Sequence, residues 1–298
     1  MLSDDLKSDF DSLVPGRTGA AGPSRRTALS VALGVGYAAA TLPVQAQTVI
    51  HTDTTGLTAG TIDYEVAGFK VPAYHAAPQG RTGLPVMLVI QEIFGVTDYI
   101  ADVCRRFAKM GYLAIAPELY ARQGDPRQVP EMARLQSEIV SKVPDAQVMA
   151  DIDGALDWAA AHGGNRAKAG ITGFCWGGRI VWLYAATGKV KAGAAFYGRL
   201  VGTPSALTPR HPIDVVGELK APVIGLYGGA DPGIPLDTVA KMQTALEAGP
   251  KAARESRFVT YRGVGHAFHA DYRPSYRAEA ATDGWQQASA FFRSHGVM

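Results

Sequence analysis

Two patterns of apolar and polar positions alternate along residues 60–298. The run at 84–92 is continuously apolar with β-branched residues, as expected of a strand buried on both faces. Further strands are predicted at 113–119, 167–174, 191–198, 221–229 and 256–263. Stretches with helical spacing follow them, at 97–112, 130–142, 146–161, from the turn at 175 to about 186, 235–248 and 276–294. This alternation predicts right-handed crossovers and a mostly parallel, doubly wound α/β sheet with helices on both faces.

A different pattern precedes this alternation. Residues 60–76 read as two antiparallel strands joined at Ala67-Gly68, with Pro72 suited to an edge strand. No linker is apparent between residues 60 and 298. We therefore expect a single α/β domain that spans residues 47–298.

The first 46 residues lack this alternation. A polar stretch with many glycines and prolines is followed by Ser24-Arg25-Arg26, an apolar run over 27–42, and the small-x-Ala sequence at 44–46. This layout predicts a secretory signal of the twin-arginine type, cleaved near Ala46. A membrane anchor and a disordered tail are the alternatives, but the run is short and rich in Gly and Ala, which weighs against an anchor. We expect export by the twin-arginine machinery to the periplasm or beyond, with no stable membrane anchoring after cleavage.

The composition narrows the classes of function. The chain is 47% hydrophobic and 19% charged, close to an average globular protein, and its net charge of +2 with no basic stripe argues against a nucleic-acid partner. Two cysteines cannot make a disulfide framework or a thiolate metal site. We expect no metal and no organic cofactor.

Ligands of doubly wound sheets bind beyond the carboxyl ends of the strands, and one such end carries a cysteine. Gly173-Phe174-Cys175-Trp176-Gly177 follows an apolar run and precedes a helical stretch. The G-x-nucleophile-x-G pattern places its central residue on a strained strand-to-helix turn that exposes the side chain above the sheet. The amides of the following helix favour a thiolate there. We interpret Cys175 as a nucleophile, with a buried structural cysteine as the alternative.

A thiol with an ordinary pKa needs a base, and a histidine lies after the last predicted strand. His266 occupies the glycine-containing loop "GVGHAF", and His269 is its nearest rival. Asp231, in "GGADPGIP", ends another strand and could orient the imidazole, although Asp-Pro-Gly is also ordinary turn chemistry. The order Cys175, Asp231, His266 is that of the α/β-hydrolase triad.

Two backbone amides are expected to form an oxyanion hole. One belongs to Trp176, after the nucleophile, and the other to Ile93, in the loop after the strand at 84–92. Glu92 is an unusual neighbour, because a carboxylate there opposes a developing oxyanion. It either turns away into a salt bridge or holds the resting thiol or the histidine.

Several segments together resemble the dienelactone hydrolase (carboxymethylenebutenolidase) family. They are Gln91-Glu92-Ile93-Phe94-Gly95, Leu119-Tyr120-Ala121-Arg122-Gln123, Gly173-Phe174-Cys175-Trp176-Gly177-Gly178 and His266. The resemblance implies an α/β-hydrolase fold, a Cys175–His266–Asp231 triad, oxyanion amides at Ile93 and Trp176, and no cofactor. It also implies that Glu92 contacts the resting cysteine and that the substrate displaces this contact.

The substrate is less closely defined by the sequence. The family's arginine for the substrate carboxylate follows the catalytic histidine by four residues, where this chain has Ala270; Arg273 and Arg122 are candidate substitutes. Aromatic side chains are expected either to line an apolar substrate pocket or to pack in the core: Tyr120, Trp176, Tyr197 and Phe268. The expected partner is a small ester or lactone.

Two alternative functions stay open. One is an exported general carboxylesterase or thioesterase with no preference for dienelactones. The other is a redox or binding protein that uses Cys175 as a sensor thiol, with Cys104 as its resolving partner. The position of Cys104 on the apolar face of a predicted helix argues against that disulfide.

Overall fold

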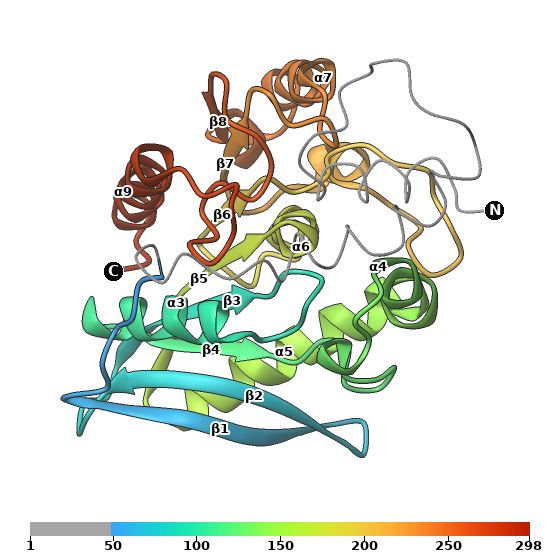
Figure 1. Cartoon of the computed structure of the whole chain (residues 1–298). Helices are drawn as coiled ribbons and strands as arrows, with labels where there is room; N and C mark the ends of the chain where they lie inside the picture. Colours follow the sequence, from blue (N-terminus) through green and yellow to red (C-terminus); the bar gives the residue numbers. More distant parts are fainter. Residues whose placement is uncertain (1–48) are drawn as a thin grey trace.

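An eight-stranded sheet forms the centre of the molecule (Figure 1). The computed structural model describes residues 49–298, so the predicted signal segment at 1–46 lies outside the described residues. The strand order is β1-β2-β4-β3-β5-β6-β7-β8. The strands are β1 (Leu57–Val66), β2 (Phe69–Pro78), β3 (Leu84–Ile90), β4 (Leu113–Pro117), β5 (Gly164–Phe174), β6 (Ala192–Phe196), β7 (Val223–Gly228) and β8 (Arg257–Tyr261).

The first two strands form the predicted antiparallel hairpin. Ala67 and Gly68 both adopt positive φ, 50° and 79°, as a two-residue hairpin turn of the mirror-image type requires. The expectation that Pro72 marks an edge strand was wrong, because β2 lies between β1 and β4. The β2–β4 pairing covers residues 73–76 only, so Pro72 stands just outside it and its missing N–H removes no hydrogen bond to β4.

The longer helices cover both faces of the sheet. They are α3 (Asp98–Lys109), α5 (Asp145–Ala161), α6 (Trp176–Ala185), α7 (Leu236–Glu247) and α9 (Ala278–Ser294), with the short α8 at Lys251–Arg254. Helices α3 and α9 share one face, where the ring centroids of Phe107 and Trp285 are 4.6 Å apart. On the other face, the Tyr184 hydroxyl of α6 donates a hydrogen bond of 2.9 Å to Asp153 of α5. The α/β architecture predicted from the alternation is confirmed.

One predicted helix is broken into short pieces. The stretch at 130–142 forms α4 (Met132–Arg134), the π-turn η2 (Leu135–Ile139) and the 3₁₀ turn η3 (Val140–Lys142). Leu135, Ile139 and Val140 are all buried, and the wider π-turn brings neighbouring apolar residues to the same side. Further 3₁₀ turns lie at η1 (Pro126–Gln128) and η4 (Pro212–Glu218).

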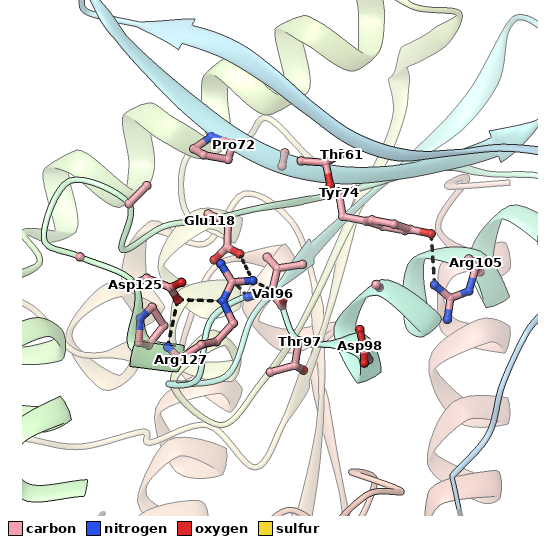
Figure 2. A pocket seen from close by; sticks show the side chains of 15 residues that line it. Thr61, Pro72, Tyr74, Val96, Thr97, Asp98, Arg105, Glu118, Asp125 and Arg127 are labelled. Carbon is pink, nitrogen blue, oxygen red and sulfur yellow. Dashed lines mark hydrogen bonds and ion pairs between the residues drawn. The ribbon is translucent and has the colours of Figure 1, made fainter. Parts of the chain in front are cut away.

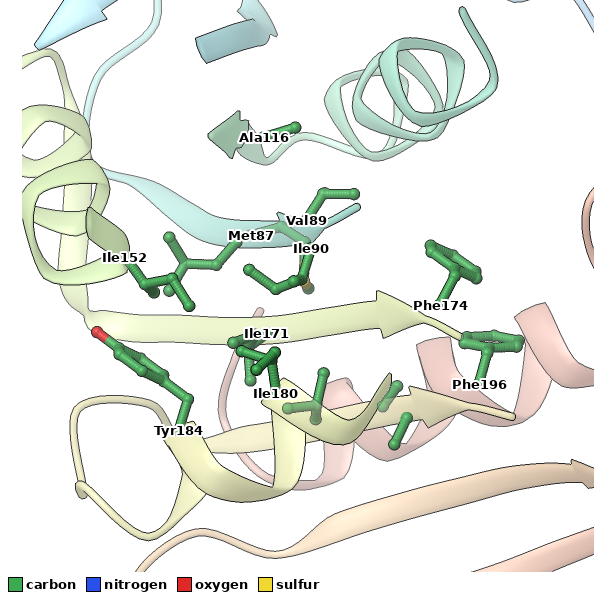
Figure 3. Packing of buried hydrophobic residues seen from close by; sticks show 14 of the residues in the cluster. Met87, Val89, Ile90, Ala116, Ile152, Ile171, Phe174, Ile180, Tyr184 and Phe196 are labelled. Atoms are coloured by element: carbon green, nitrogen blue, oxygen red, sulfur yellow. The ribbon is translucent and has the colours of Figure 1, made fainter. Parts of the chain in front are cut away.

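The core is apolar on both sides of the central strands. Figure 3 shows Met87 and Ile90 of β3 on the side of Ile171, Val89 pointing the other way, and the Phe174 and Phe196 rings at the strand ends. These two rings stack with centroids 4.8 Å apart. The packing therefore fixes the positions of the residues that follow β3, β5 and β6.

The strand order reverses at β3, so successive crossovers run to opposite sides of this strand. Strand β4 lies on one side of β3 and β5 on the other, and both pair with it in parallel. A crevice at the carboxyl ends of the strands is expected at such a switch point. No helix among residues 49–298 has both the length and the apolar character needed to cross a membrane.

Candidate active site

Cys175 stands on a sharp turn between β5 and α6. Its φ and ψ are 55° and −117°, a conformation that non-glycine residues rarely adopt, and its amide donates a 3.0 Å hydrogen bond to the Phe196 carbonyl. A Cβ on Gly173 would lie 2.4 Å from the Gly177 carbonyl oxygen, and one on Gly177 would lie 2.5 Å from the Gln91 carbonyl oxygen. Both glycines are therefore required by the close approach of the backbone.

Asp231 and His266 meet across the ends of β7 and β8. Asp231 Oδ2 and His266 Nδ1 are 2.6 Å apart, and Asp231 Oδ1 accepts a hydrogen bond of 2.9 Å from the Gly233 amide. Gly228 permits this approach, because a Cβ there would lie 2.5 Å from the carbonyl oxygens of Val264 and Gly265. The carboxylate therefore fixes one imidazole nitrogen and leaves Nε2 for other chemistry.

The electrostatics connect His266 to the cysteine. Burial would lower the pKa of His266, but the charges of Asp231 and Cys175 outweigh it and raise that pKa well above its ordinary value. Nε2 is buried, and a hydrogen-bonding interaction with the Cys175 side chain also contributes to raising this pKa. Asp231 and the sulfur thus both stabilise the protonated form of the imidazole.

Two backbone amides near the cysteine have no hydrogen-bond acceptor among the described residues. Neither the Trp176 nor the Ile93 N–H donates a hydrogen bond to an acceptor within the described part of the chain. Trp176 is the first residue of α6, so the partial positive charge of the helix N-terminus lies at the same place. Ile93 lies in the tight turn at the end of β3, where Glu92 and Gly95 form an isolated bridge. The two predicted oxyanion donors are therefore free to donate hydrogen bonds to a ligand oxygen.

Glu92 is buried, with 1% of its surface exposed, and its partner is a phenol. The Tyr272 hydroxyl donates a 2.7 Å hydrogen bond to Glu92 Oε2, and it accepts a 3.0 Å hydrogen bond from Arg273 Nε. No hydrogen bond joins Glu92 to Cys175 or His266 among residues 49–298. The contact between Glu92 and the resting cysteine, implied by the resemblance, is therefore replaced here by a contact with Tyr272.

Beside Glu92 and Tyr272, the Arg273 guanidinium has an N–H group that is available for a further hydrogen bond. Its guanidinium lies over the Phe94 ring at 4.7 Å, and its Nη2 is buried without a hydrogen-bond partner among the described residues. The side chain is only 7% exposed. Burial would lower the pKa of Arg273, but Tyr272, Glu92 and Cys175 outweigh it and raise that pKa. A buried, charged donor with a free N–H is suited to an anionic ligand group.

Arg122, the other candidate arginine, does not reach the site. Its guanidinium forms an ion pair with Asp151 of α5 and lies 4.5 Å over the Phe69 ring of the first hairpin. It also donates to the Val66 carbonyl. The expectation for Arg122 fails because Asp151, far along the sequence, already holds this cation.

The predicted aromatic residues occupy two kinds of position. The Tyr120 ring meets the Trp176 ring edge-on at 4.9 Å, beside the nucleophile turn. Tyr197 has a positive φ of 39°, and its ring lies 5.0 Å from that of His266. Phe268, by contrast, is fully buried between Tyr197 and Tyr261, so its role is core packing.

His269, the rival of His266, serves the core as well. Its Nδ1 is 2.7 Å from the Tyr99 hydroxyl, and burial together with the charge of Arg106 lowers its pKa to about 3. A histidine that stays neutral at every ordinary pH and has no carboxylate partner is unsuited to act as the base.

The site does not coincide with the 580 Å³ cavity in Figure 2. That cavity lies between the first hairpin, α3 and the loop after β4, and none of Cys175, Asp231 and His266 lines it. Three of its charged side chains pair with one another, since Arg127 forms ion pairs with Glu118 and Asp125. Among residues 49–298, no cluster of His, Cys, Asp and Glu could hold a metal ion.

Sequence reasoning missed Tyr272. It is the hydrogen-bond partner of Glu92, yet it lies in an irregular loop where no periodicity points to a role. The adjacent Arg273 was considered only because of its charge.

A mostly parallel sheet with a strained cysteine turn after β5, an acid after β7 and a histidine after β8 defines the α/β-hydrolase class. The profile of the dienelactone hydrolase family matches residues 71–296. The chain is 55% identical over 276 residues to a protein of Methylorubrum extorquens named "Putative carboxymethylenebutenolidase", with 92% of this chain and 94% of the relative covered. It is 49% identical over 263 residues to a protein of the same name from Salmonella typhimurium, with 88% of this chain and 96% of the relative covered. This chain therefore belongs to the dienelactone hydrolase family.

A solved structure agrees with this assignment. The crystal structure titled "Putative Dienelactone Hydrolase" from Klebsiella pneumoniae superposes with a TM-score of 0.77 at 52% sequence identity. It covers 80% of this chain and 98% of its own. The protein is thus a hydrolase of the dienelactone hydrolase kind.

Proposed function

We propose that the protein hydrolyses a small ester or lactone of the dienelactone type, with Cys175 as nucleophile. The observation that carries the proposal is the strained cysteine at the end of β5, with a histidine whose raised pKa depends on both Asp231 and that cysteine. The names of the relatives support a lactone substrate.

The reaction follows from the positions of these groups. The Cys175 thiolate, paired with the His266 imidazolium, adds to the carbonyl carbon to give a tetrahedral oxyanion. Collapse expels the alcohol or enol oxygen, which takes a proton from His266, and leaves a thioester on Cys175. His266 then removes a proton from water, which attacks the thioester and releases the acid. Asp231 holds the imidazole in one orientation throughout.

The oxyanion is stabilised by the amides of Ile93 and Trp176. Both lack an acceptor within residues 49–298, so no existing hydrogen bond has to break when the oxyanion forms. Loss of one such donor typically costs about 2.7–4 kcal/mol of transition-state stabilisation. The neighbouring Glu92 carboxylate is held by Tyr272, which reduces its repulsion of the developing charge.

Arg273 is our candidate for binding the substrate carboxylate. Ala270 is buried and cannot do so, whereas Nη2 of Arg273 has a free N–H close to the cysteine. Burial strengthens an ionic hydrogen bond to a carboxylate there. A general carboxylesterase or thioesterase is the second candidate function, and the alanine at position 270 favours it.

One comparison separates the two candidates. The hydrolysis of cis- and trans-dienelactone and of p-nitrophenyl acetate is measured with the wild-type protein, Cys175→Ala and the matched control Cys104→Ala. We expect lactone turnover that disappears with Cys175→Ala and persists with Cys104→Ala. Ester turnover without lactone turnover would support the general esterase, and activity retained by Cys175→Ala would contradict the mechanism.

The redox alternative is disfavoured by the position of Cys104. This thiol is fully buried on α3, and burial raises its pKa above the ordinary value for a thiol. A protonated, inaccessible thiol is a poor resolving partner.

Export is a further part of the proposal. It rests on Arg25-Arg26 and the apolar run that follows them. The test replaces the pair with Lys-Lys and measures the protein in the periplasmic fraction. Delivery that is unchanged would contradict the twin-arginine route.

A further inference from the structure

A buried carboxylate beside a nucleophilic thiolate needs a defined partner. Glu92 has 1% of its surface exposed, so water cannot satisfy it, and an unpaired charge there would be costly. Its carboxylate would also accept a hydrogen bond from the Cys175 thiol, which would favour the protonated sulfur. The group that holds Glu92 therefore affects the reactivity of the cysteine.

That group is Tyr272. The phenol donates its proton to Glu92 Oε2 at 2.7 Å and accepts a hydrogen bond from Arg273 Nε at 3.0 Å. Because Arg273 donates to the phenol oxygen, the phenol proton is directed to the carboxylate. The Tyr272 ring is held in turn against Tyr99 of α3, with centroids 5.6 Å apart.

Charged and titratable groups from several elements surround Glu92 and Cys175. The charges of both residues act on Tyr197, at the end of β6, and on Arg273, so the carboxylate and the sulfur share one environment. The charge of Glu92 also acts on Tyr99, and that of Cys175 acts on His266. Among residues 49–298, the side chain that donates a hydrogen bond to Glu92 is Tyr272.

We propose that Tyr272 is a positioning residue that holds the Glu92 carboxylate away from the sulfur of Cys175 and so leaves His266 as the partner of that sulfur. The inference rests on the proposed function of Cys175 as the nucleophile. The loop after β8 would then both contain His266 and position Glu92 through Tyr272.

The test measures the reactivity of Cys175 without any substrate. The rate of alkylation by iodoacetamide is followed from pH 5 to 10, and mass spectrometry assigns the label to the Cys175 peptide. The proteins are the full-length wild type, Tyr272→Phe, Glu92→Gln and the double variant. Tyr276→Phe, which removes a hydroxyl from the same loop, is the matched control.

We expect Tyr272→Phe to slow alkylation about tenfold at pH 7 and to move the midpoint of the pH profile up by about one unit, because the released carboxylate favours the thiol. In the Glu92→Gln background, the same substitution should change the rate about twofold or less. Tyr276→Phe should match the wild type. The phenylalanine keeps the ring packing against Tyr99, and thermal unfolding checks the fold.

A Tyr272→Phe profile that superimposes on the wild type would overturn the inference. An equal shift in the wild-type and Glu92→Gln backgrounds would also overturn it, because the effect would then not pass through the carboxylate. Ester hydrolysis by the alkylated protein is measured separately. Hydrolysis that survives alkylation would contradict the proposed function and leave the alkylation profiles as the test of Tyr272.

Discussion

Two carboxylates of the site, Asp231 and Glu92, are buried, and they are held in different ways. Asp231 contacts an imidazole that titrates, and a backbone amide fixes its second oxygen. Glu92 contacts a phenol whose oxygen is in turn held by Arg273. Asp231 can therefore change the charge state of a group beside the sulfur, whereas Glu92 is held in place by a neutral donor. Under the proposed function, Asp231 would serve proton transfer and Glu92 would not.

The largest effect is expected on the Asp231 side. Asp231→Asn leaves the shape unchanged but removes the charge that stabilises the imidazolium, so kcat for p-nitrophenyl acetate should fall about 10⁴-fold. Steady-state kinetics measure the loss. A decrease smaller than tenfold would show that this carboxylate is not part of the catalytic group.

On the Glu92 side, the next largest effect is expected at Arg273. Arg273→Met removes the free N–H, so KM for dienelactone should rise about 100-fold, the size expected for one hydrogen bond to a charged group. KM for the neutral p-nitrophenyl acetate should change by no more than a few-fold.

Arg122→Met is the matched control for Arg273. It should leave both KM values unchanged and lower the melting temperature, because it leaves Asp151 buried without its ion pair. If the two arginine variants have the same kinetics, Arg273 does not bind the carboxylate.

A smaller effect is expected at Glu92 itself. Glu92→Gln keeps an acceptor for the Tyr272 hydroxyl and removes the charge beside the oxyanion hole, so kcat/KM for p-nitrophenyl acetate should stay within about tenfold of the wild type. A loss as large as that of Asp231→Asn would make the two carboxylates equivalent and remove the distinction between them.

The smallest effect concerns stability and pH. Because Asp231 and Cys175 raise the pKa of His266 in the folded state, their stabilisation is fully present below the unfolded pKa of about 6.5 and is lost as the pH rises through the folded pKa. The difference in free energy of unfolding between the wild type and Asp231→Asn should therefore be larger at pH 6 than at pH 10. Urea unfolding at both values measures it, and a constant difference would contradict the raised pKa.

The sheet and the positions after its strands could be predicted from the sequence. Apolar runs such as the one ending at Ile90 are long enough to identify buried strands, and the Gly173–Gly177 spacing reflects a backbone contact that excludes other residues. The order of Cys175, Asp231 and His266 then follows from their positions at strand ends. These features are local, so a single sequence contains them.

Contacts between distant loops could not be predicted. The bond between Tyr272 and Glu92 joins residues 180 positions apart, and the pairing of Arg122 with Asp151 depends on how α5 lies beside the first hairpin. The sequence gives each charge but not its partner. The break in the helix at 130–142 has the same cause, since burial of Leu135, Ile139 and Val140 depends on the surface beneath them.

The central claim is that Cys175 carries the acyl group. The most direct measurement mixes the protein with p-nitrophenyl acetate, quenches the reaction in acid during the first turnover, and maps the acetylated peptide by mass spectrometry. The account predicts one acetyl group on the peptide that contains Cys175, none on the peptide with Cys104, and none in Cys175→Ala. An acetyl group on another residue, or full turnover in Cys175→Ala, would contradict it.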